Sequence, residues 1–398
     1  MLDGLDRVEW ARLTHGHGPA TDVPAALRAL ALGGASQAAR ALATLDDTLC
    51  HQGRCYGGTV AAIPFLAELA LRPGPRTPGL LHLLRAIAAP SCARMLAQGQ
   101  STRAFYADVT GSATDRDNTG AASGTSRHVD AECHSAVARA LPQLLPLLDS
   151  DAPAQVAAML MLLAEFPAAG TDTAPRIFAA IKRSGTPTVR RAGLATLGQL
   201  SRSVEVDPAD PHLRRWLDPA QPLPIRVEAA LSMTVKEAAR RDVLLEGLRH
   251  SDALYQSDTA DRALFPRPGW TADRVATCLA RWRGDDAHRV ETAKAIITAL
   301  PRARAAGTAT TGQVRALLAV LADGAPIEGL FRGRRRSRLS ELDRQALQAI
   351  AAQGDWITGD TRNAAFADMM HRCGLPDTAR DLARFAIRPG VLARLLRR

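Results

Sequence analysis

At 398 residues the chain is longer than a typical single core requires, so we expect several domains or one array of repeats. Alanine and leucine supply most of its 46% hydrophobic content and aromatic residues only 4%, which favours close-packed helices over sheets. The formal net charge of +10 favours polyanionic partners, although only three lysines (Lys182, Lys236 and Lys294) contribute, and this arginine excess is also typical of a coding bias.

Three features exclude a secreted or membrane-spanning protein and predict a cytoplasmic one. The six cysteines are dispersed through a long chain, unlike those of a small disulfide-stabilised domain. The first residues include Asp3, Asp6 and Glu9, which argues against a secretory leader. The most apolar run, residues 156–163, is far too short to cross a bilayer.

Helical patterns follow one another through residues 1–97, the first predicted domain. Asp22 is a suitable N-cap for a helix that begins at Val23 and Pro24. Further helices are predicted over residues 35–50, 59–71 and 80–88. Pro64 lies inside the second of these, and a proline in a helix interior removes one hydrogen bond and bends the helix.

Residues 98–130 differ from the segments on either side. They contain DVTGSATDRDNTGAASGTSR, which has almost no large apolar side chain after Thr110. Such a segment buries too little surface to offset its conformational entropy. We therefore predict a flexible polar insertion, with a binding loop or lid as the alternative.

Helical periodicity resumes at Ala131 and defines a central domain of residues 131–325. Pro153, Pro187 and Pro224 each open a predicted helix, at intervals of 34 and 37 residues. An alanine follows each proline by five positions and a leucine by seven; these are Ala158, Ala192 and Ala229, and Leu160, Leu194 and Leu231. Such intervals are typical of stacked two-helix units. Partner helices are predicted over residues 175–183 and 211–217, and later helices over residues 270–283, 286–300 and 312–322.

The clearest helix of this domain is TPTVRRAGLATLGQL, residues 186–200. Val189, Gly193, Leu197 and Leu200 fall on one face and predict a buried stripe. Arg190, Arg191 and Gln199 are expected to lie off that stripe.

Two stretches of the central domain, LPQLLPLLDSDAPAQVAAMLMLLAEF and TPTVRRAGLATLGQL, resemble HEAT repeats. WARLTHGHGPATDVPAALRAL and HQGRCYGGTVAAIPFLAELA are similar to segments of bacterial HEAT-repeat proteins of the PBS-lyase type. The resemblance implies an all-α fold, an α-solenoid (superhelix) of stacked two-helix HEAT-like repeats. It also implies peptide-like or nucleic-acid-like partners, and it carries over no catalytic residue.

A basic loop, residues 326–338, interrupts the array. It contains FRGRRRSR, and a C-terminal helical cap of residues 339–398 follows, with helices over residues 339–353, 361–373 and 377–387. One interpretation is a solvated loop, which requires no function. The other is a binding contact, which suits an acidic protein surface or backbone phosphates.

Arginines are the candidate binding residues: Arg190, Arg191, Arg214, Arg215, Arg226, Arg332, Arg334, Arg335, Arg336 and Arg338. Because the second helices of a solenoid line its concave surface, the first five are candidates for a row that binds phosphates or carboxylates. The favoured interpretation is that they pair with acidic residues of neighbouring repeats, and the binding row is the alternative.

His15, His17, Cys50, His51 and Cys55 form the group most like a metal site, since zinc binds cysteine and histidine. Their spacing is looser than that of the paired cysteines of structural zinc sites, so we predict turn residues and no metal or cofactor. His128, Cys133 and His134 receive the same interpretation.

No catalytic motif is present: the chain lacks GxSxG, HExxH and a phosphate loop ending in GK[ST]. The leading hypothesis is a non-enzymatic scaffold that binds a protein partner on its concave face, in a regulatory or immunity-type role. The alternative is a nucleic-acid-binding protein, with or without glycosylase-like activity. That activity would need a basic cleft lined by aromatics such as Trp216, Tyr255, Trp282 or Trp356.

Overall fold

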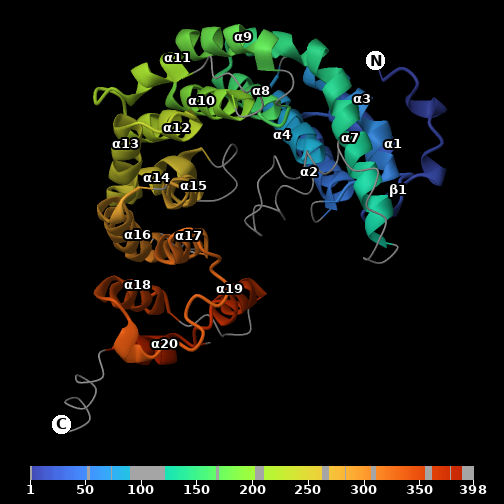
Figure 1. Cartoon of the computed structure of the whole chain (residues 1–398). Coiled ribbons are helices and arrows are strands. Elements are labelled where there is room, and N and C mark those ends of the chain that lie inside the picture. Colours follow the sequence, from blue (N-terminus) through green and yellow to red (C-terminus); the bar gives the residue numbers. More distant parts are fainter. Residues whose placement is uncertain are drawn as a thin grey trace. The chain divides into compact units, whose positions relative to one another are not determined.

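The computed structural model describes residues 2–51, 54–72, 74–89, 122–166, 170–201, 210–261, 269–282, 284–305, 311–354, 361–376 and 378–387. Almost all the regular structure in these ranges is helical (Figure 1), which confirms the all-α prediction. The chain forms two compact units, residues 1–207 and 208–398, and each has its own buried apolar residues. Within the described ranges, no helix combines the length and the apolar character that crossing a membrane requires.

The first unit opens with two short 3-10 helices and a small hairpin, which the sequence did not predict. The 3-10 helices are Leu5–Arg7 and Trp10–Arg12, and strands β1 (Thr14–His15) and β2 (Gly18–Pro19) pair antiparallel. The helices that follow are α1 (Val23–Leu32), α2 (Ala35–Leu49), α3 (Gly57–Ala70), α4 (Thr77–Ala88), α7 (Ala122–Leu144), α8 (Pro153–Leu163), α9 (Gly170–Arg183) and α10 (Pro187–Ser201). A 3-10 helix, Leu145–Asp149, joins α7 to α8.

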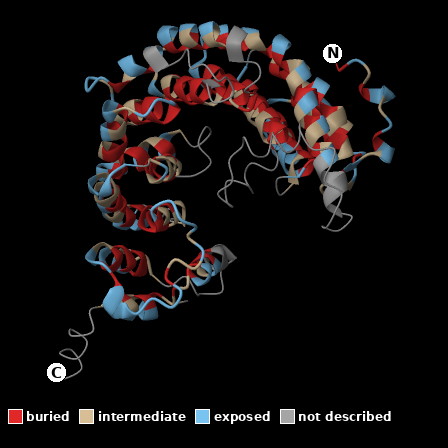
Figure 2. Ribbon diagram, in the orientation of Figure 1, coloured by how far each residue is buried: buried red, intermediate tan, exposed pale blue. Residues whose placement is uncertain are grey.

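Many helices of the first unit pack against helices that are not next to them in the chain. One row runs through α4, α8 and α10, each packed against the next (Figure 1). Helix α7 packs against α3 and α4, and α9 packs against α10. Helix α8 is buried from Gln155 to Leu163 without interruption (Figure 2). A helix that is apolar on all sides is stable only when other helices cover it, as they do here.

The proline register predicted from the sequence is confirmed helix by helix. Helices α8 and α10 begin at Pro153 and Pro187, and Pro224 lies in the first turn of α12 (Leu223–Ser232). The alanines at the fifth offset are fully buried, and so are the leucines at the seventh, none of which is more than 2% exposed. The same helical phase therefore directs the same residue types into the core three times.

Helix α10 is more deeply buried than the sequence predicted. Val189, Leu197 and Leu200 are buried as expected. The whole segment 191–198 is also buried, so the buried surface extends around the helix beyond the predicted stripe, while Arg190 and Gln199 are half-buried. Arg191, expected to lie off the buried stripe, is 0% exposed. The buried hydroxyl of Thr196 in this segment has a hydrogen-bond acceptor, because it donates to the carbonyl oxygen of Leu160, 2.7 Å away.

The second unit consists of shorter helices. They are α11 (Asp210–Arg214), α12, α13 (Ala238–Arg249), α14 (Ser251–Ala260), α15 (Trp270–Ala280), α16 (Asp286–Ala305), α17 (Thr311–Ala322), α18 (Glu341–Ala351), α19 (Thr361–Arg372) and α20 (Ala379–Ala386), with 3-10 helices Arg215–Leu217 and Arg336–Arg338. The sequence predicted neither α13 nor α14. Helix α13 packs against α12, α15 and α16, and α18 packs against α16 and α20.

Two predicted boundaries differ from the observed elements. Helix α7 begins at Ala122, inside the segment 98–130 that was expected to be a flexible insertion. The rest of that segment, residues 98–121, lies outside the described residues. The predicted central domain, residues 131–325, contains the division between the two compact units after Asp207.

A carboxylate held by two arginines links α13 to α16. Glu291 of α16 accepts a hydrogen bond from Arg241 and another from Arg249, at 2.6 Å from the Nη2 atom of the latter; both arginines lie on α13. The hydrogen bond from Arg241, reinforced by that from Arg249, lowers the pKa of Glu291 below 4.5.

Acidification is therefore expected to weaken the second unit through Glu291. Because the pKa of Glu291 is lower in the folded than in the unfolded chain, its stabilisation is present above about pH 4.5 and is lost as the pH falls through the folded-state value. The effect is small, since 40% of this side chain is exposed. Urea unfolding of the native chain and of Glu291→Gln measures it: the difference in unfolding free energy should shrink below pH 4.5. A difference that stays constant down to pH 2 would contradict the assignment.

Candidate functional site

The most concentrated exposed charge of the described residues lies between α17 and α18. Here we call residues 332–338 the arginine turn; its arginines, all exposed, are Arg332, Arg334, Arg335, Arg336 and Arg338. The sequence predicted this run as a basic loop, and the structure shows that it ends in a 3-10 helix, Arg336–Arg338. Its backbone is therefore partly ordered, although every one of its arginine side chains faces solvent.

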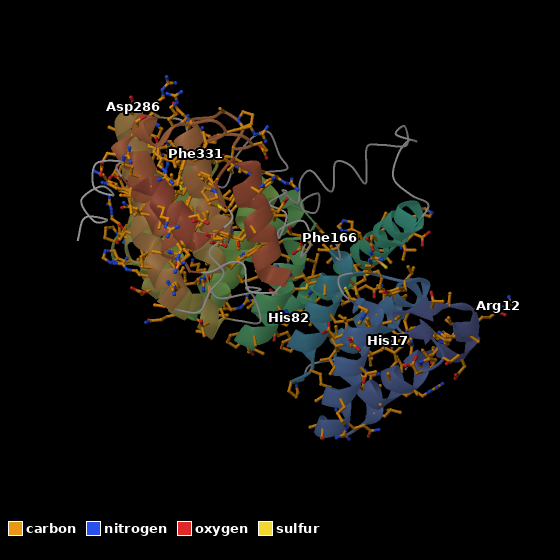
Figure 3. All side chains as sticks on the ribbon, turned by 90° about the horizontal axis from the view of Figure 1, so that it is seen from below. Arg12, His17, His82, Phe166, Asp286 and Phe331 are labelled. Atoms are coloured by element: carbon orange, nitrogen blue, oxygen red, sulfur yellow. The ribbon has the colours of Figure 1, made fainter. Side chains whose placement is uncertain are left out.

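Buried residues hold both ends of the arginine turn. Phe331 is 1% exposed (labelled in Figure 3), and its amide donates to the carbonyl oxygen of Cys373, 2.9 Å away. At the other end Leu339 is buried, and Ser340 caps α18 together with Asp343. The turn thus leaves the core at one apolar residue and re-enters it at another.

Two further contacts fix the course of the turn. The buried Arg344 donates through Nη2 to the carbonyl oxygen of Arg336 at 2.6 Å, and through Nη1 to that of Ala386 at 3.2 Å. Gly374, at a φ of +77°, lies so close to the turn that a Cβ there would stand 2.7 Å from the backbone nitrogen of Arg332. Glycine is therefore required at this position both for its left-handed conformation and for the close approach.

Little negative charge balances the arginine turn. Arg334 lies over the Phe331 ring, with its nearest acidic partner, Asp343, at 3.9 Å. For the other four arginines of the turn, the described part of the chain places no carboxylate within ion-pair distance. Several arginines elsewhere in the second unit are paired with carboxylates, as Arg214–Glu237, Arg226–Glu246, Arg241–Glu291, Arg249–Glu291, Arg274–Glu228 and Arg289–Asp286. The turn is therefore a local surplus of positive charge.

Arg226 acts as a brace within the second unit. Its Nη1 and Nη2 atoms donate to the two carboxylate oxygens of Glu246 at 2.8 and 2.9 Å, and its side chain is only 11% exposed. Arg214 forms an ion pair with Glu237 at 2.9 Å. Arg215 remains exposed, with its guanidinium 5.5 Å from the centre of the Trp216 ring.

Arg190 and Arg191 belong to the first unit, whereas Arg214, Arg215 and Arg226 belong to the second. Arg190 is half-buried and Arg191 fully buried. A buried guanidinium cannot contribute to a binding surface. Of these five candidate arginines, Arg191 thus lies in the core and Arg226 in a brace.

The predicted histidine and cysteine group separates into two parts. His17 and His51 come together, and both contact Asp47, a residue that the sequence did not single out. His15 is buried, and its Nε2 atom lies 2.8 Å from a carboxylate oxygen of Asp22. Asp22, predicted to cap α1, makes no side-chain capping bond and binds His15 instead.

The thiols of the two cysteines contact the backbone of α4. The Cys50 thiol donates to the carbonyl oxygen of Ala86 and the Cys55 thiol to that of Ile87, both in the region of α4. Hydrogen bonds to Cys133 and Cys50, together with burial, raise the pKa of Cys55. A buried thiol whose pKa is raised is a poor metal ligand, because metals bind the thiolate.

The second predicted cluster, His128, Cys133 and His134, is also divided. His134 stacks on Phe166 with ring centroids 4.5 Å apart, and its Nδ1 atom lies 3.0 Å from the carbonyl oxygen of Ala88. Cys133 is fully buried, and His128 faces Glu132 at 3.6 Å. These residues pack between helices and do not converge on one point.

Two of the surface depressions formed by the described residues lie on separate compact units. The larger, of about 530 Å³, is shallow and lies on α16, lined by Asp286, Ala287, Val290, Glu291 and Lys294. The smaller, of about 210 Å³, lies between the start of α8 and the end of α9, with Asp151, Arg183 and Thr186 in its wall. No aromatic side chain lines either of them.

The predicted aromatic residues are otherwise engaged. Tyr255 is buried, and its hydroxyl accepts a hydrogen bond from Gln313 at 3.2 Å. Trp282 packs beneath the guanidinium of Arg240, 5.2 Å from the ring centre. Trp356 lies outside the described residues. The depressions above therefore lack the stacking surface that base excision requires.

Comparisons with protein-family models, with curated proteins and with solved structures found no match to this chain. No family is assigned to it.

Proposed function

We propose that this chain is a non-enzymatic binding protein that holds an acidic protein partner through the arginine turn. The observation that carries the proposal is the group of five exposed arginines, four of which have no carboxylate within ion-pair distance among the described residues, on a segment anchored in the core at both ends. Arginine pairs with carboxylates through two parallel hydrogen bonds, and it is enriched among residues that dominate binding energy. A turn whose backbone is already ordered loses less entropy on binding than a free loop.

The scaffold that carries the turn is proposed to be an α-solenoid of HEAT-like repeats acting in the cytoplasm. Support comes from the shared proline register of α8, α10 and α12 and from the packing of α4 on α8 and of α8 on α10. The free thiols of Cys50, Cys55, Cys133, Cys278 and Cys373 agree with a reducing compartment. Because Arg191 is buried and Arg226 is paired, we place the contact on the arginine turn rather than on the expected concave row.

Nucleic acid is the second candidate partner, favoured by the net charge of +10. Tight binding to a duplex uses about six to ten phosphate contacts spread along the backbone. The arginine turn gathers its five arginines within residues 332–338, which suits a compact acidic patch better than an extended phosphate backbone. A protein partner is therefore the first choice, and the proposal includes no base-excision step.

Neutralising the arginine turn is expected to abolish partner capture. Changing its five arginines to glutamine should weaken binding at least about 30-fold, which corresponds to the roughly 2 kcal/mol of one dominant interface residue. The measurement is a pull-down from a nuclease-treated lysate of the source cells. The captured protein is then titrated against the native chain and against the five-arginine variant, and the two dissociation constants are compared.

A matched control removes the same number of positive charges elsewhere. It carries glutamine at five dispersed exposed arginines, Arg7, Arg12, Arg40, Arg54 and Arg384. This variant should capture the partner as well as the native chain does. Equal loss in both variants would show that only net charge matters. Capture seen only from lysate that has not been treated with nuclease, together with duplex DNA binding that weakens steeply as salt rises, would replace the protein partner by nucleic acid.

A further inference from the structure

The hairpin β1–β2 brings a histidine onto the end of α2. In the turn between the strands, the amide of Gly16 donates to the carbonyl oxygen of Thr48, 2.9 Å away, in the last turn of α2. A Cβ on Gly16 would stand only 2.4 Å from the Cβ of His51. Only glycine allows this approach, and it places the next residue, His17 (labelled in Figure 3), beside α2.

Three side chains of two segments then converge on one point. The Nε2 atom of His17 lies 2.9 Å from one carboxylate oxygen of Asp47, and the Nδ1 atom of His51 lies 3.2 Å from the other. The two imidazole rings stand edge to face with centroids 4.6 Å apart. One ligand atom from each of the three residues lies within 4.8 Å of the other two.

Neighbouring groups hold this arrangement in place. The amide of His17 donates to Nδ1 of His15 at 3.0 Å, so the proton of the neutral His15 ring is on Nε2, which faces Asp22. Because His15 is buried, this pair fixes the backbone at His17. Asp47 lies in the last turn of α2, and His51 lies two residues beyond the end of this helix, within 3.2 Å of Asp47.

We propose that His17, Asp47 and His51 bind one divalent zinc-type ion, which fastens the hairpin to the end of α2. Zinc takes nitrogen and carboxylate ligands at about 2.0–2.2 Å, so its tetrahedral ligand atoms are roughly 3.3 Å apart. The His–Asp separations of 2.9 and 3.2 Å are close to that value. Calcium and magnesium prefer sites built from oxygen ligands, which two imidazoles do not provide.

Binding replaces protons by the ion. Since an ionised carboxylate only accepts hydrogen bonds, Nε2 of His17 and Nδ1 of His51 donate to Asp47 when no metal is bound. On binding, each of these nitrogens gives up its proton, to the other ring nitrogen or to water, and offers its lone pair. Three protein ligands leave the fourth position to water, and solvent reaches it because the side chains of His17 and Asp47 are 47% and 65% exposed.

Zinc titration of the full-length, reduced and metal-free chain by calorimetry tests the proposal. We expect one zinc ion per chain, a higher unfolding temperature with zinc, and Co²⁺ spectra without a thiolate-to-cobalt band. His17→Ala, Asp47→Asn and His51→Ala should each weaken binding by more than the 10–100-fold that loss of a supporting residue costs. Two of these side chains are largely exposed, so circular dichroism should show the native helix content.

The matched control is His288→Ala, which removes an exposed histidine that also contacts an aspartate, Asp285, three residues before it. This variant should bind zinc like the native chain. The proposal is overturned if the native chain takes up no zinc, or if binding survives in His17→Ala and Asp47→Asn. A thiolate-to-cobalt band would likewise overturn it, because it would assign the ion to the cysteines near α4.

Discussion

Replacing Arg274 with alanine is expected to lower the free energy of unfolding of the second unit by about 3–5 kcal/mol. Arg274 of α15 donates through Nη1 to Glu228 of α12 at 2.7 Å, and the Glu228 side chain is 0% exposed. The other carboxylate oxygen of Glu228 has no hydrogen-bond partner among the described residues. Without Arg274 a buried negative charge would be left uncompensated, which costs far more than an exposed ion pair contributes.

Urea unfolding measures this loss, and two comparisons identify its cause. Arg289→Ala removes an arginine whose partner, Asp286, is 86% exposed, and it should change stability by no more than about 0.5 kcal/mol. Adding Glu228→Gln to Arg274→Ala should recover part of the loss, because a neutral amide costs less to bury than a carboxylate. If Arg274→Ala proves no more destabilising than Arg289→Ala, water reaches Glu228 and the pair is not a buried one.

Leu197→Ala is expected to cost the first unit about 2–5 kcal/mol, the range for removing a leucine side chain from a closed core. Leu197 is 1% exposed in α10, a helix that packs against both α8 and α9. Helices buried on most sides cannot move to fill a cavity without disturbing several neighbours. A total stability of roughly 5–15 kcal/mol makes this a substantial loss.

Leu32→Ala is the control for this substitution. Leu32 ends α1 and is 74% exposed, so the same change of side chain removes no buried volume. Thermal unfolding should give a clearly lower midpoint for Leu197→Ala and an unchanged one for Leu32→Ala. Equal midpoints for the two variants would mean that the helical phase of α10 is misassigned.

Sequence periodicity predicted the helices in which local and tertiary preferences agree. In α8, α10 and α12 a proline near the start coincides with small and apolar residues at the offsets that face the core. Sequence periodicity did not predict helices α13 and α14, because part of their buried face is polar. Arg240 is 6% exposed yet donates to the carbonyl oxygen of Ala230, and the buried Asp258 accepts from Thr271. A pattern that counts charged residues as exposed cannot recognise such a face.

The candidate sites show the same limit. The arginine turn is contiguous in sequence, so its charge was readable before its structure was known. The pairing of Arg226 with Glu246 depends on how α12 packs against α13, so it could not be predicted from the sequence. Among the metal-like residues the sequence found His17 and His51 but missed Asp47, although the four-residue spacing of Asp47 and His51 was a usable signal. The close approach of Gly16 to His51 brings His17 next to His51 and Asp47, whereas the cysteines contact α4. No local sequence pattern encodes this approach.

The contact of Glu291 with two arginines also has a mechanical consequence. Arg241 and Arg249 are about 12 Å apart along the axis of α13, at a rise of 1.5 Å per residue, and they reach one carboxylate on α16 from opposite directions. If α16 slides along α13 in one direction, the Glu291–Arg241 contact is stretched, and if it slides in the other direction, the Glu291–Arg249 contact is stretched. In neither case can the other contact become shorter. The pair therefore resists shear between the two helices in both directions, whereas a single ion pair would yield by swinging its long side chain.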